Sequence, residues 1–272
     1  MGRDECKHRF VYLGQYSMVN RHSRRQPERA CWLLFERFWE LDALRGVALV
    51  FMVAYHFVFD LNYFEILRLG PQSPFFLAAP AIGGAFLLLA GVSLSISYAR
   101  HKNLGAAALF SRQLRRGALL FAAAALITAA TLAYPDRGFV VFGVIHLIAV
   151  SVVLSFAFRN FGTANLFLGL ALVLAGVAAG SVTVDTPFLV WLGVSFPGFY
   201  TLDYYPLLPW FGVVLVGMFL GKTVYPGANR SFRVPAPRLG QLQFLGRNSL
   251  AIYLLHQPIL VGIITAFKFL AG

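Results

Sequence analysis

Charged residues are scarce in this chain of 272 amino acids, and acidic residues are the scarcest, with 11 Asp and Glu against 23 Lys and Arg. Only 12% of the residues are charged, whereas soluble globular domains are close to a quarter charged. Cysteine is also rare. Cys6 and Cys31 show no metal-binding spacing, and we expect both to be reduced thiols if the segment that holds them is cytoplasmic. These shortages argue against a soluble domain.

Apolar residues fill the space instead, at 58% of the chain with a mean hydropathy of +0.69. They come in blocks long enough to cross a bilayer rather than in amphipathic stripes. We therefore predict an all-α integral membrane protein, a bundle of about seven transmembrane helices. The expected spans are 41–64, 75–98, 117–134, 139–158, 164–182, 204–224 and 248–270.

The basic residues are distributed unevenly along the chain. Most lie in the first 36 residues and in the loops after the second, fourth and sixth expected spans, which by the positive-inside rule places the N-terminus in the cytoplasm and the C-terminus outside. This topology, with a basic rim against anionic lipid headgroups, accounts for the net charge of +12. No basic soluble module is present, so nucleic acid is not an expected partner. We expect 1–36 to be a poorly ordered cytoplasmic extension and 37–272 to be the transmembrane domain.

Four ionisable residues in the first span stand at helical spacing. Asp42 and Arg45 are three residues apart, and His56 and Asp60 are four apart, so each pair shares a helix face. Arg45 and His56 are separated by roughly 16 Å along a helix. Polar groups at membrane depth persist mainly where they face a cavity, a partner or a substrate. His56 is a candidate general base that Asp60 could orient, although a histidine satisfied by a neighbouring helix would give the same pattern.

Four further polar residues lie in or beside later spans. His146 and His256, the latter followed by Gln257, are each more typical of structural histidines, but together with His56 they could line one polar cavity. A three-histidine metal site is conceivable, but the spacing does not require one and we expect none. Asp203 is expected at the outer mouth, either in a ligand site or as the N-cap of the sixth span.

Arginines gather on the predicted inner side. They could bind an anionic ligand such as a phosphate-rich nucleotide approaching from the cytoplasm, or they could simply reflect positive-inside topology. This inner basic set comprises Arg45, Arg115, Arg116 and Arg247.

Four blocks, in order, resemble the transmembrane acyltransferase superfamily. In particular the chain resembles its prokaryotic branch with a heparan-α-glucosaminide N-acetyltransferase-like catalytic domain, from about Arg37 to the C-terminus. The blocks are Leu44-Arg45-Gly46 with the apolar run to Tyr55-His56, Gly84 to Ser95, Phe196 to Trp210, and Leu245-Gly246-Arg247-Asn248 to His256.

The resemblance implies acyl transfer from acetyl-CoA or another acyl-CoA, in a multi-pass protein of the prokaryotic plasma membrane. His56 matches the proposed base of the O-acyltransferase branch. In the heparan enzyme this position resembles an asparagine and the catalytic histidine lies further on, where this chain has none. Arg45 would meet the CoA phosphates, and His256 with Gln257 would bind or polarise the carbonyl. Asn248 belongs to the last matched block, and Asp42 stands two residues before the first.

The acceptor stays open among a glycan, a lipid-linked sugar and a small amine. The resemblance also implies fewer spans than in larger relatives, so part of their acceptor site could be absent. Membrane lipids are the expected surroundings, and a homo-oligomer stays open.

Two other functions fit the same residues. A proton-coupled transporter could use His56, Asp60, His146 and His256 as a relay, although no internal repeat supports it. A non-catalytic scaffold could pack a partner against Gly and Ser faces such as that of Gly83, Gly84 and Gly91.

Overall fold

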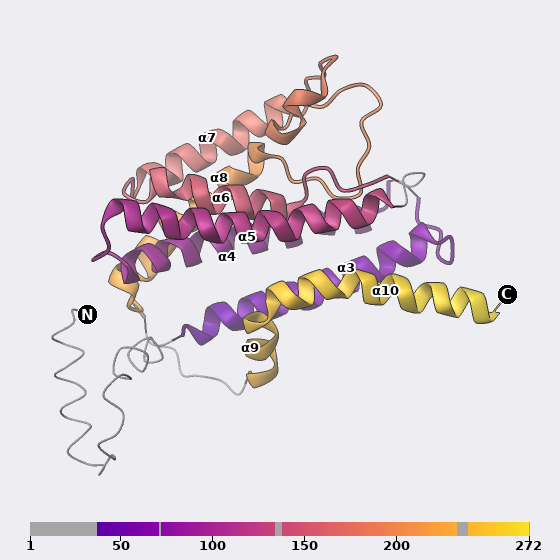
Figure 1. Cartoon of the computed structure of the whole chain (residues 1–272), viewed down its shortest axis with the longest axis horizontal. Helices are drawn as coiled ribbons and strands as arrows, with labels where there is room; N and C mark the ends of the chain where they lie inside the picture. The colour runs from indigo at the N-terminus through magenta and orange to yellow at the C-terminus, as the bar shows by residue number, and fades with distance from the viewer. Residues whose placement is uncertain (1–36, 71, 134–137, 233–238, 272) are drawn as a thin grey trace, which may run out of the picture. The chain divides into compact units, whose positions relative to one another are not determined.

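The computed structural model describes residues 37–70, 72–133, 138–232 and 239–271. The predicted extension 1–36 lies outside the described residues. Backbone contacts divide the chain into two units, Met1–Trp39 and Glu40–Gly272, and the second holds every feature discussed below. Its helices, drawn in Figure 1, are α3 (Trp39–Tyr63), α4 (Ala78–Arg100), α5 (Ala106–Leu132), α6 (Val144–Phe158), α7 (Ala164–Ala179), α8 (Leu207–Val224), α9 (Gly240–Arg247) and α10 (Ser249–Ala271).

The helices have the length and composition of a membrane bundle. Five of them (α3, α4 with the short 3-10 turn Pro74–Leu77, α5, α8 and α10) are long and apolar enough to cross a bilayer, and α6 and α7 are shorter apolar helices. Large apolar side chains such as Leu119, Leu174 and Phe269 are exposed, which suits contact with lipid rather than water. The predicted all-α integral membrane fold is confirmed, and each of the seven expected spans has its own apolar helix.

The start of α5 and the presence of α9 differ from the sequence prediction. Helix α5 begins at Ala106, well before the expected start at residue 117, so Arg112, Arg115 and Arg116 lie on a helix rather than in a loop. Long arginine side chains can extend from a helix toward the interface, so a helix tolerates them near its end where a hydropathy boundary does not. The expected polar loop before the last span also contains α9, which is too short and too polar to register as a span.

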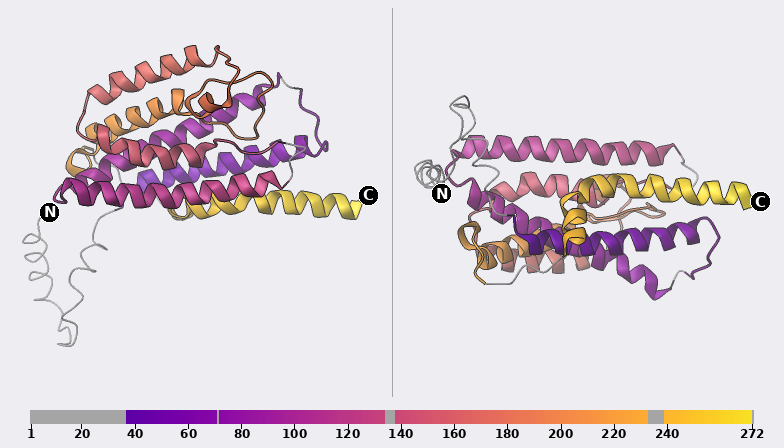
Figure 2. Two further views of the ribbon diagram at one scale, coloured as in Figure 1. Left: turned by 45° about the horizontal axis from the view of Figure 1, so that its top comes forward. Right: turned by 90° about the horizontal axis from the view of Figure 1, so that it is seen from below.

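Glycines set the closest packing in the bundle. Helix α8 lies between α4 and α7 (Figure 2). A Cβ added at Gly91 of α4 would overlap the carbonyl oxygen of Val214, and one at Gly217 of α8 would overlap that of Leu88. Small residues allow this approach of helix backbones. Gly91 of the Gly-rich face therefore packs against α8 of the same chain.

Helices α3 and α9 meet through a second glycine crossing. A Cβ at Gly46 of α3 would overlap the carbonyl oxygen of Leu242 on α9, and a Cβ at Gly246 of α9 would overlap that of Asp42 on α3. Helix α10 follows α9 directly and runs beside α3 (Figure 1). The glycines of the Leu44-Arg45-Gly46 and Leu245-Gly246-Arg247 blocks therefore act together, each clearing room for the other's helix.

The segment before α8 is fastened to the segment before α6. The backbone N–H of Tyr205 donates to the carbonyl of Phe142 at 2.8 Å, and Thr201 Oγ1 donates to the carbonyl of Phe139 at 2.8 Å. The connection between α7 and α8 contains the 3-10 turn Pro187–Leu192. These bonds bring Asp203 to the start of α6.

Candidate functional site

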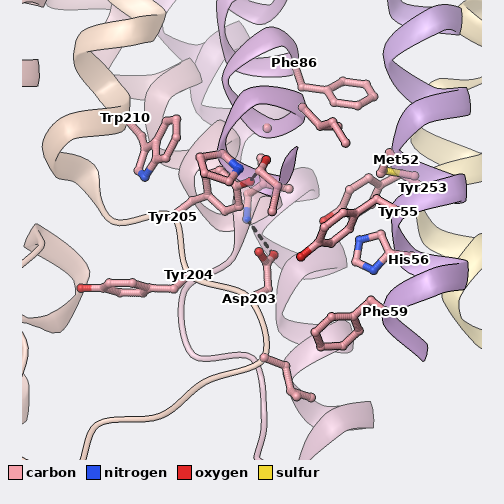
Figure 3. Close-up of a pocket in the computed structure, with 16 residues that line it drawn as sticks. Met52, Tyr55, His56, Phe59, Phe86, Asp203, Tyr204, Tyr205, Trp210 and Tyr253 are labelled. Carbon is pink, nitrogen blue, oxygen red and sulfur yellow. Dashed lines mark hydrogen bonds between the residues drawn. The ribbon is translucent and has the colours of Figure 1, made fainter. Parts of the chain in front are cut away.

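A cavity of about 230 Å³ lies among α3, α4, α10 and the segment before α8 (Figure 3). His56 and Asp203 are its ionisable lining residues. Half of the other lining residues are aromatic: Tyr55, Phe59, Phe86, Tyr204, Tyr205, Trp210 and Tyr253. The site therefore combines one imidazole and one carboxyl group with several flat rings and hydroxyls.

Asp203 is held by the first turn of α6. Its Oδ2 accepts a hydrogen bond from the backbone N–H of Val144 at 3.1 Å, and a Cβ at Gly143 would overlap the carboxyl group. The alternative that Asp203 caps the sixth span is wrong, because α8 begins at Leu207 with Pro206 as its N-cap. A helix N-terminus favours negative charge, which explains why a carboxylate is tolerated here.

Two opposing effects set the pKa of the Asp203 carboxyl group. Burial raises the pKa of its carboxyl to about 6, while the backbone N–H donors of Val144 and Tyr204 act in the opposite direction. Its charge acts on the hydroxyls of Tyr55, Tyr205 and Tyr253. At neutral pH the cavity therefore contains a carboxylate ringed by phenol groups, which can accept hydrogen bonds from hydroxyls or pair with an amine.

The imidazole ring of His56 on α3 lies next to that of His256 on α10. Their ring centroids are 4.9 Å apart. His256 is buried and its Nδ1 lies 2.7 Å from the carbonyl of Tyr253, so Nδ1 carries the donated proton and Nε2 carries a lone pair. His256 Nε2 and His56 Nδ1 are both buried and have no hydrogen-bond partner in the part of the chain that the structure describes. Two adjacent imidazoles with unused nitrogens are more typical of a working site than of packing.

Asp60 makes a different contact from the one expected. It is 2% exposed, and its Oδ1 accepts a hydrogen bond from Gln257 Nε2 at 2.7 Å. Among the described residues it makes no hydrogen bond to His56. Because Gln257 follows His256, this bond fixes α10 against α3 at the level of the histidine pair. Asp60 therefore acts on His56 indirectly, by helping to set the position of His256.

Asp42 joins two arginines that are far apart in the sequence. Its Oδ1 accepts from Arg45 Nη1 at 3.1 Å and its Oδ2 from Arg247 Nε at 3.4 Å, and Asp42 itself is 5% exposed. Arg45 also donates to Ser93 on α4. One buried carboxylate therefore orients two guanidinium groups, and the cluster keeps a net positive charge. This Asp42 cluster, defined by Asp42, Arg45 and Arg247, follows directly from the Gly46 and Gly246 crossing.

The remaining expected site residues are placed less directly. Arg116 lies within electrostatic range of Arg45, and its neighbour Arg115 is exposed on α5. His146 does not line the cavity: its Nδ1 accepts from the N–H of Gly143 at 3.3 Å and its Nε2 lies 3.4 Å from Thr128 Oγ1.

Asn248 caps the end of α9, since its Nδ2 donates to the carbonyl of Phe244 at 2.9 Å. The contacts of His146 and Asn248 are thus structural, and their binding roles stay predictions. Among the described residues, no group of three His, Cys, Asp or Glu side chains is placed to hold a metal ion.

Sequence reasoning missed the tyrosines of the cavity. Tyr55 precedes His56, Tyr253 stands one helical turn before His256, and Tyr204 with Tyr205 follows Asp203. Proximity to predicted site residues was the available signal. It was weak because tyrosines are also common at membrane interfaces.

Comparison with known proteins bears on the whole arrangement. The family model for the heparan-alpha-glucosaminide N-acetyltransferase catalytic domain matches residues 37–258. Searches of curated proteins and of solved structures found no match. The matched range includes the cavity lining, the histidine pair and the Asp42 cluster. The chain is therefore a membrane protein that belongs to the heparan-alpha-glucosaminide N-acetyltransferase catalytic domain family.

Proposed function

We propose that this protein moves an acyl group, most simply acetyl, from acyl-CoA to a hydroxyl or amine of a glycan, a lipid-linked sugar or a small amine. The observation that carries the proposal is the placement of His56. It lines an aromatic cavity on the same helix as Arg45, about 11 residues and roughly 16 Å from the Asp42 cluster.

The donor would extend between these two points. Arginine forks bind phosphate well, so Arg45 and Arg247 are the expected partners of the CoA phosphates. Asp42 holds both guanidinium groups in place without neutralising the pair. A donor bound there could extend along α3 and present its thioester beside His56.

Acyl transfer needs a base that removes a proton from the attacking hydroxyl or amine, and the leaving thiolate needs a proton in return. The ring nitrogen of His56 that faces the cavity takes the acceptor's O–H or N–H proton while the acceptor oxygen or nitrogen attacks the thioester carbonyl carbon. The new C–O or C–N bond forms, the C–S bond breaks, and the imidazolium returns the proton to the departing thiolate. The acyl group changes partner, and His56 ends as it began.

His256 is the residue we assign to positioning this base. Its Nδ1–H donates to the carbonyl of Tyr253, so its Nε2 can accept a hydrogen bond from His56 Nδ1–H after a small rotation of either ring. That would leave the other nitrogen of His56 with the lone pair that a base requires, as the third member does in a Ser-His-Asp triad. Asp60 and Gln257 would then maintain the distance between the rings.

The cavity limits what the acceptor can place there. At about 230 Å³ it is smaller than pockets for drug-sized ligands, which run from about 300 Å³ upward. Flat aromatic walls and the Asp203 carboxylate suit one sugar ring or one amine-bearing group. We therefore expect only the reacting end of a larger acceptor to enter.

The test is transfer of a labelled acetyl group from acetyl-CoA to a panel of amino sugars and glycans by purified protein. His56→Gln should reduce transfer by about 10²- to 10⁴-fold, the usual contribution of a general base. His101→Gln is the matched control, because His101 ends α4 and lies outside the cavity lining. A thermal shift with acetyl-CoA that His56→Gln retains would show that the donor still binds. Full activity of His56→Gln would exclude His56 as the base.

A proton-coupled transporter is the second candidate, favoured by one observation. His56, His256 and Asp60 each have a buried polar atom without a hydrogen-bond partner among the described residues, and polar groups within membrane helices mark proton paths as well as active sites. Uptake of a solute by proteoliposomes in the absence of acyl-CoA would support this alternative.

A further inference from the structure

A second cavity, of about 390 Å³, opens where α4, α6 and α8 end and α5 begins. None of its lining residues is acidic, and three are cationic: Lys102, Arg159 and Lys222. Each cation comes from a different segment, namely the turn after α4, the end of α6 and the last turn of α8. We call this the basic cavity.

The basic cavity is separate from the site described above. It shares no lining residue with the aromatic cavity, and it includes no member of the Asp42 cluster. The acid nearest to it through a direct contact is Glu40, which accepts from the hydroxyl of the lining residue Tyr225 at 3.2 Å. Arg230 already binds both oxygens of Glu40, at 2.8 and 2.9 Å. Glu40 is therefore engaged and does not balance the three cations.

Two of the three cations, Arg159 and Lys222, lie around the end of α6. The Arg159 guanidinium lies 3.9 Å from the ring centroid of Phe156 and its Nη1 donates to the carbonyl of that residue. The Lys222 amine lies beside Gly162, in the turn that follows α6. No carboxylate pairs with Lys102, Arg159 or Lys222 in the described ranges. Three positive charges around one hollow, without a counter-ion among the described residues, leave a site for an anion.

We propose that the basic cavity binds the phosphate group of an anionic ligand. The volume lies within the usual range of ligand pockets, about 300–1,000 Å³, and exceeds the space a lone ion needs. Basic pockets between the ends of membrane helices bind anionic lipid headgroups, and a soluble phosphate ester such as a nucleotide would meet the same cations. The bound phosphate joins the ends of α4, α6 and α8. The proposal does not depend on the proposed acyl transfer.

A structural role for the same cations must be distinguished from binding. Cations in the last turn of a helix stabilise the partial negative charge of that helix end. In that case, removing them would lower stability equally with and without a ligand. Binding instead requires a ligand-dependent effect that disappears with the cations.

The experiment measures thermal shifts of the full chain in detergent, with dioleoylphosphatidylglycerol, zwitterionic dioleoylphosphatidylcholine, inorganic phosphate and ADP added separately. The test variant is Arg159→Gln with Lys222→Gln. The matched control removes two exposed cations outside the basic cavity, Arg68→Gln with Arg112→Gln. If the double variant does not fold, Lys222→Gln alone takes its place.

We expect phosphatidylglycerol to stabilise the parent and the control, and to bind the test variant about tenfold more weakly or worse, while phosphatidylcholine has no effect. Stabilisation by ADP or phosphate alone, lost in the same variant, would support the site with a soluble ligand as its source. Equal shifts in parent and test variant, or no shift with any phosphate-bearing probe, would overturn the proposal. Neither acyl-CoA nor an acceptor is present, so these outcomes are independent of the acyltransferase assay.

Discussion

Asp203 is the residue whose chemistry conflicts most with its surroundings. Its folded pKa of about 6 exceeds the ordinary value of 3.8, so the folded protein holds a proton there that the unfolded chain releases. Stability attributed to this group is therefore present at low pH and declines as pH rises from 3.8 to about 6. At neutral pH the carboxylate is a net cost to the fold. A costly charge in a cavity is typical of a residue kept for function.

Asp203→Asn separates the effect of the carboxylate charge from the effect of the hydrogen bond to Val144. The asparagine oxygen can still accept from the Val144 N–H, so the start of α6 stays capped while the charge is removed. We expect an apparent melting temperature at neutral pH equal to or above that of the parent, a flatter pH dependence between 3.8 and about 6, and a loss of acetyl transfer of at least about tenfold. Melting curves across this pH range and the transfer assay measure both. An unchanged pH slope would show that Asp203 is not the titrating group.

The glycine crossing between α3 and α9 is the element on which the Asp42 cluster depends. A Cβ at Gly246 has no space because the carbonyl of Asp42 occupies it, and backbone cannot yield as a flexible side chain would. We expect Gly246→Ala to destabilise the protein by about 1–3 kcal/mol, as overpacking does, and to weaken acyl-CoA binding by displacing Arg247 from Asp42. Thermal melting and acetyl-CoA titration measure the two effects.

Gly262→Ala supplies the control for this prediction. Gly262 lies within α10 and a Cβ there meets nothing within 4 Å, so the same change adds only a favourable helix propensity of up to about 1 kcal/mol. Both substitutions add one methyl group to a helical glycine, but only Gly246 lies at a helix crossing. Comparable stability of the two variants would mean that α3 and α9 can separate without penalty.

Hydropathy located the membrane helices because lipid solvation depends on a local average over about 20 residues. Hydropathy did not identify α9 or the early start of α5, because charged residues in these helical segments lower the local average. Within the candidate site, the spacing of His56 and Asp60 correctly indicated one helix face. The partner of Asp60 was not predictable, because Gln257 reaches it only after α10 packs against α3.

Asp203 illustrates the same limit. Its position before α8 suggested a cap for that helix, yet the donor is Val144, which is distant in sequence. Composition and periodicity describe each helix separately, whereas a site is made where helices meet. The resemblance to a known family supplied part of the missing information, because its sequence blocks include residues that lie where the helices are in contact.

At the scale of the molecule, the proposed donor path depends on which end of the bundle faces the cytoplasm. The turns after α4 and α6 and the basic cavity lie at one end, and the segments after α5 and α7 lie at the other. If acyl-CoA enters from the cytoplasm, the end with the Asp42 cluster must face inward, as the positive-inside rule also predicts. Helix α7 is a suitable place to test this, because its 16 residues span only about 24 Å, less than the roughly 30 Å of a bilayer core.

Single cysteines on either side of α7 test the orientation in a chain freed of its own thiols by Cys6→Ser and Cys31→Ser. Ser181→Cys follows α7 and Thr163→Cys precedes it, and both positions are exposed. We expect a membrane-impermeant maleimide to label Ser181→Cys on intact cells and Thr163→Cys only after permeabilisation. The reversed pattern would place Arg45 and Arg247 away from cytoplasmic acyl-CoA and would contradict the proposed donor path. Equal labelling of both positions from outside would mean that α7 does not cross. The bundle would then have an even number of crossings, and the C-terminus would lie on the same side as the N-terminus.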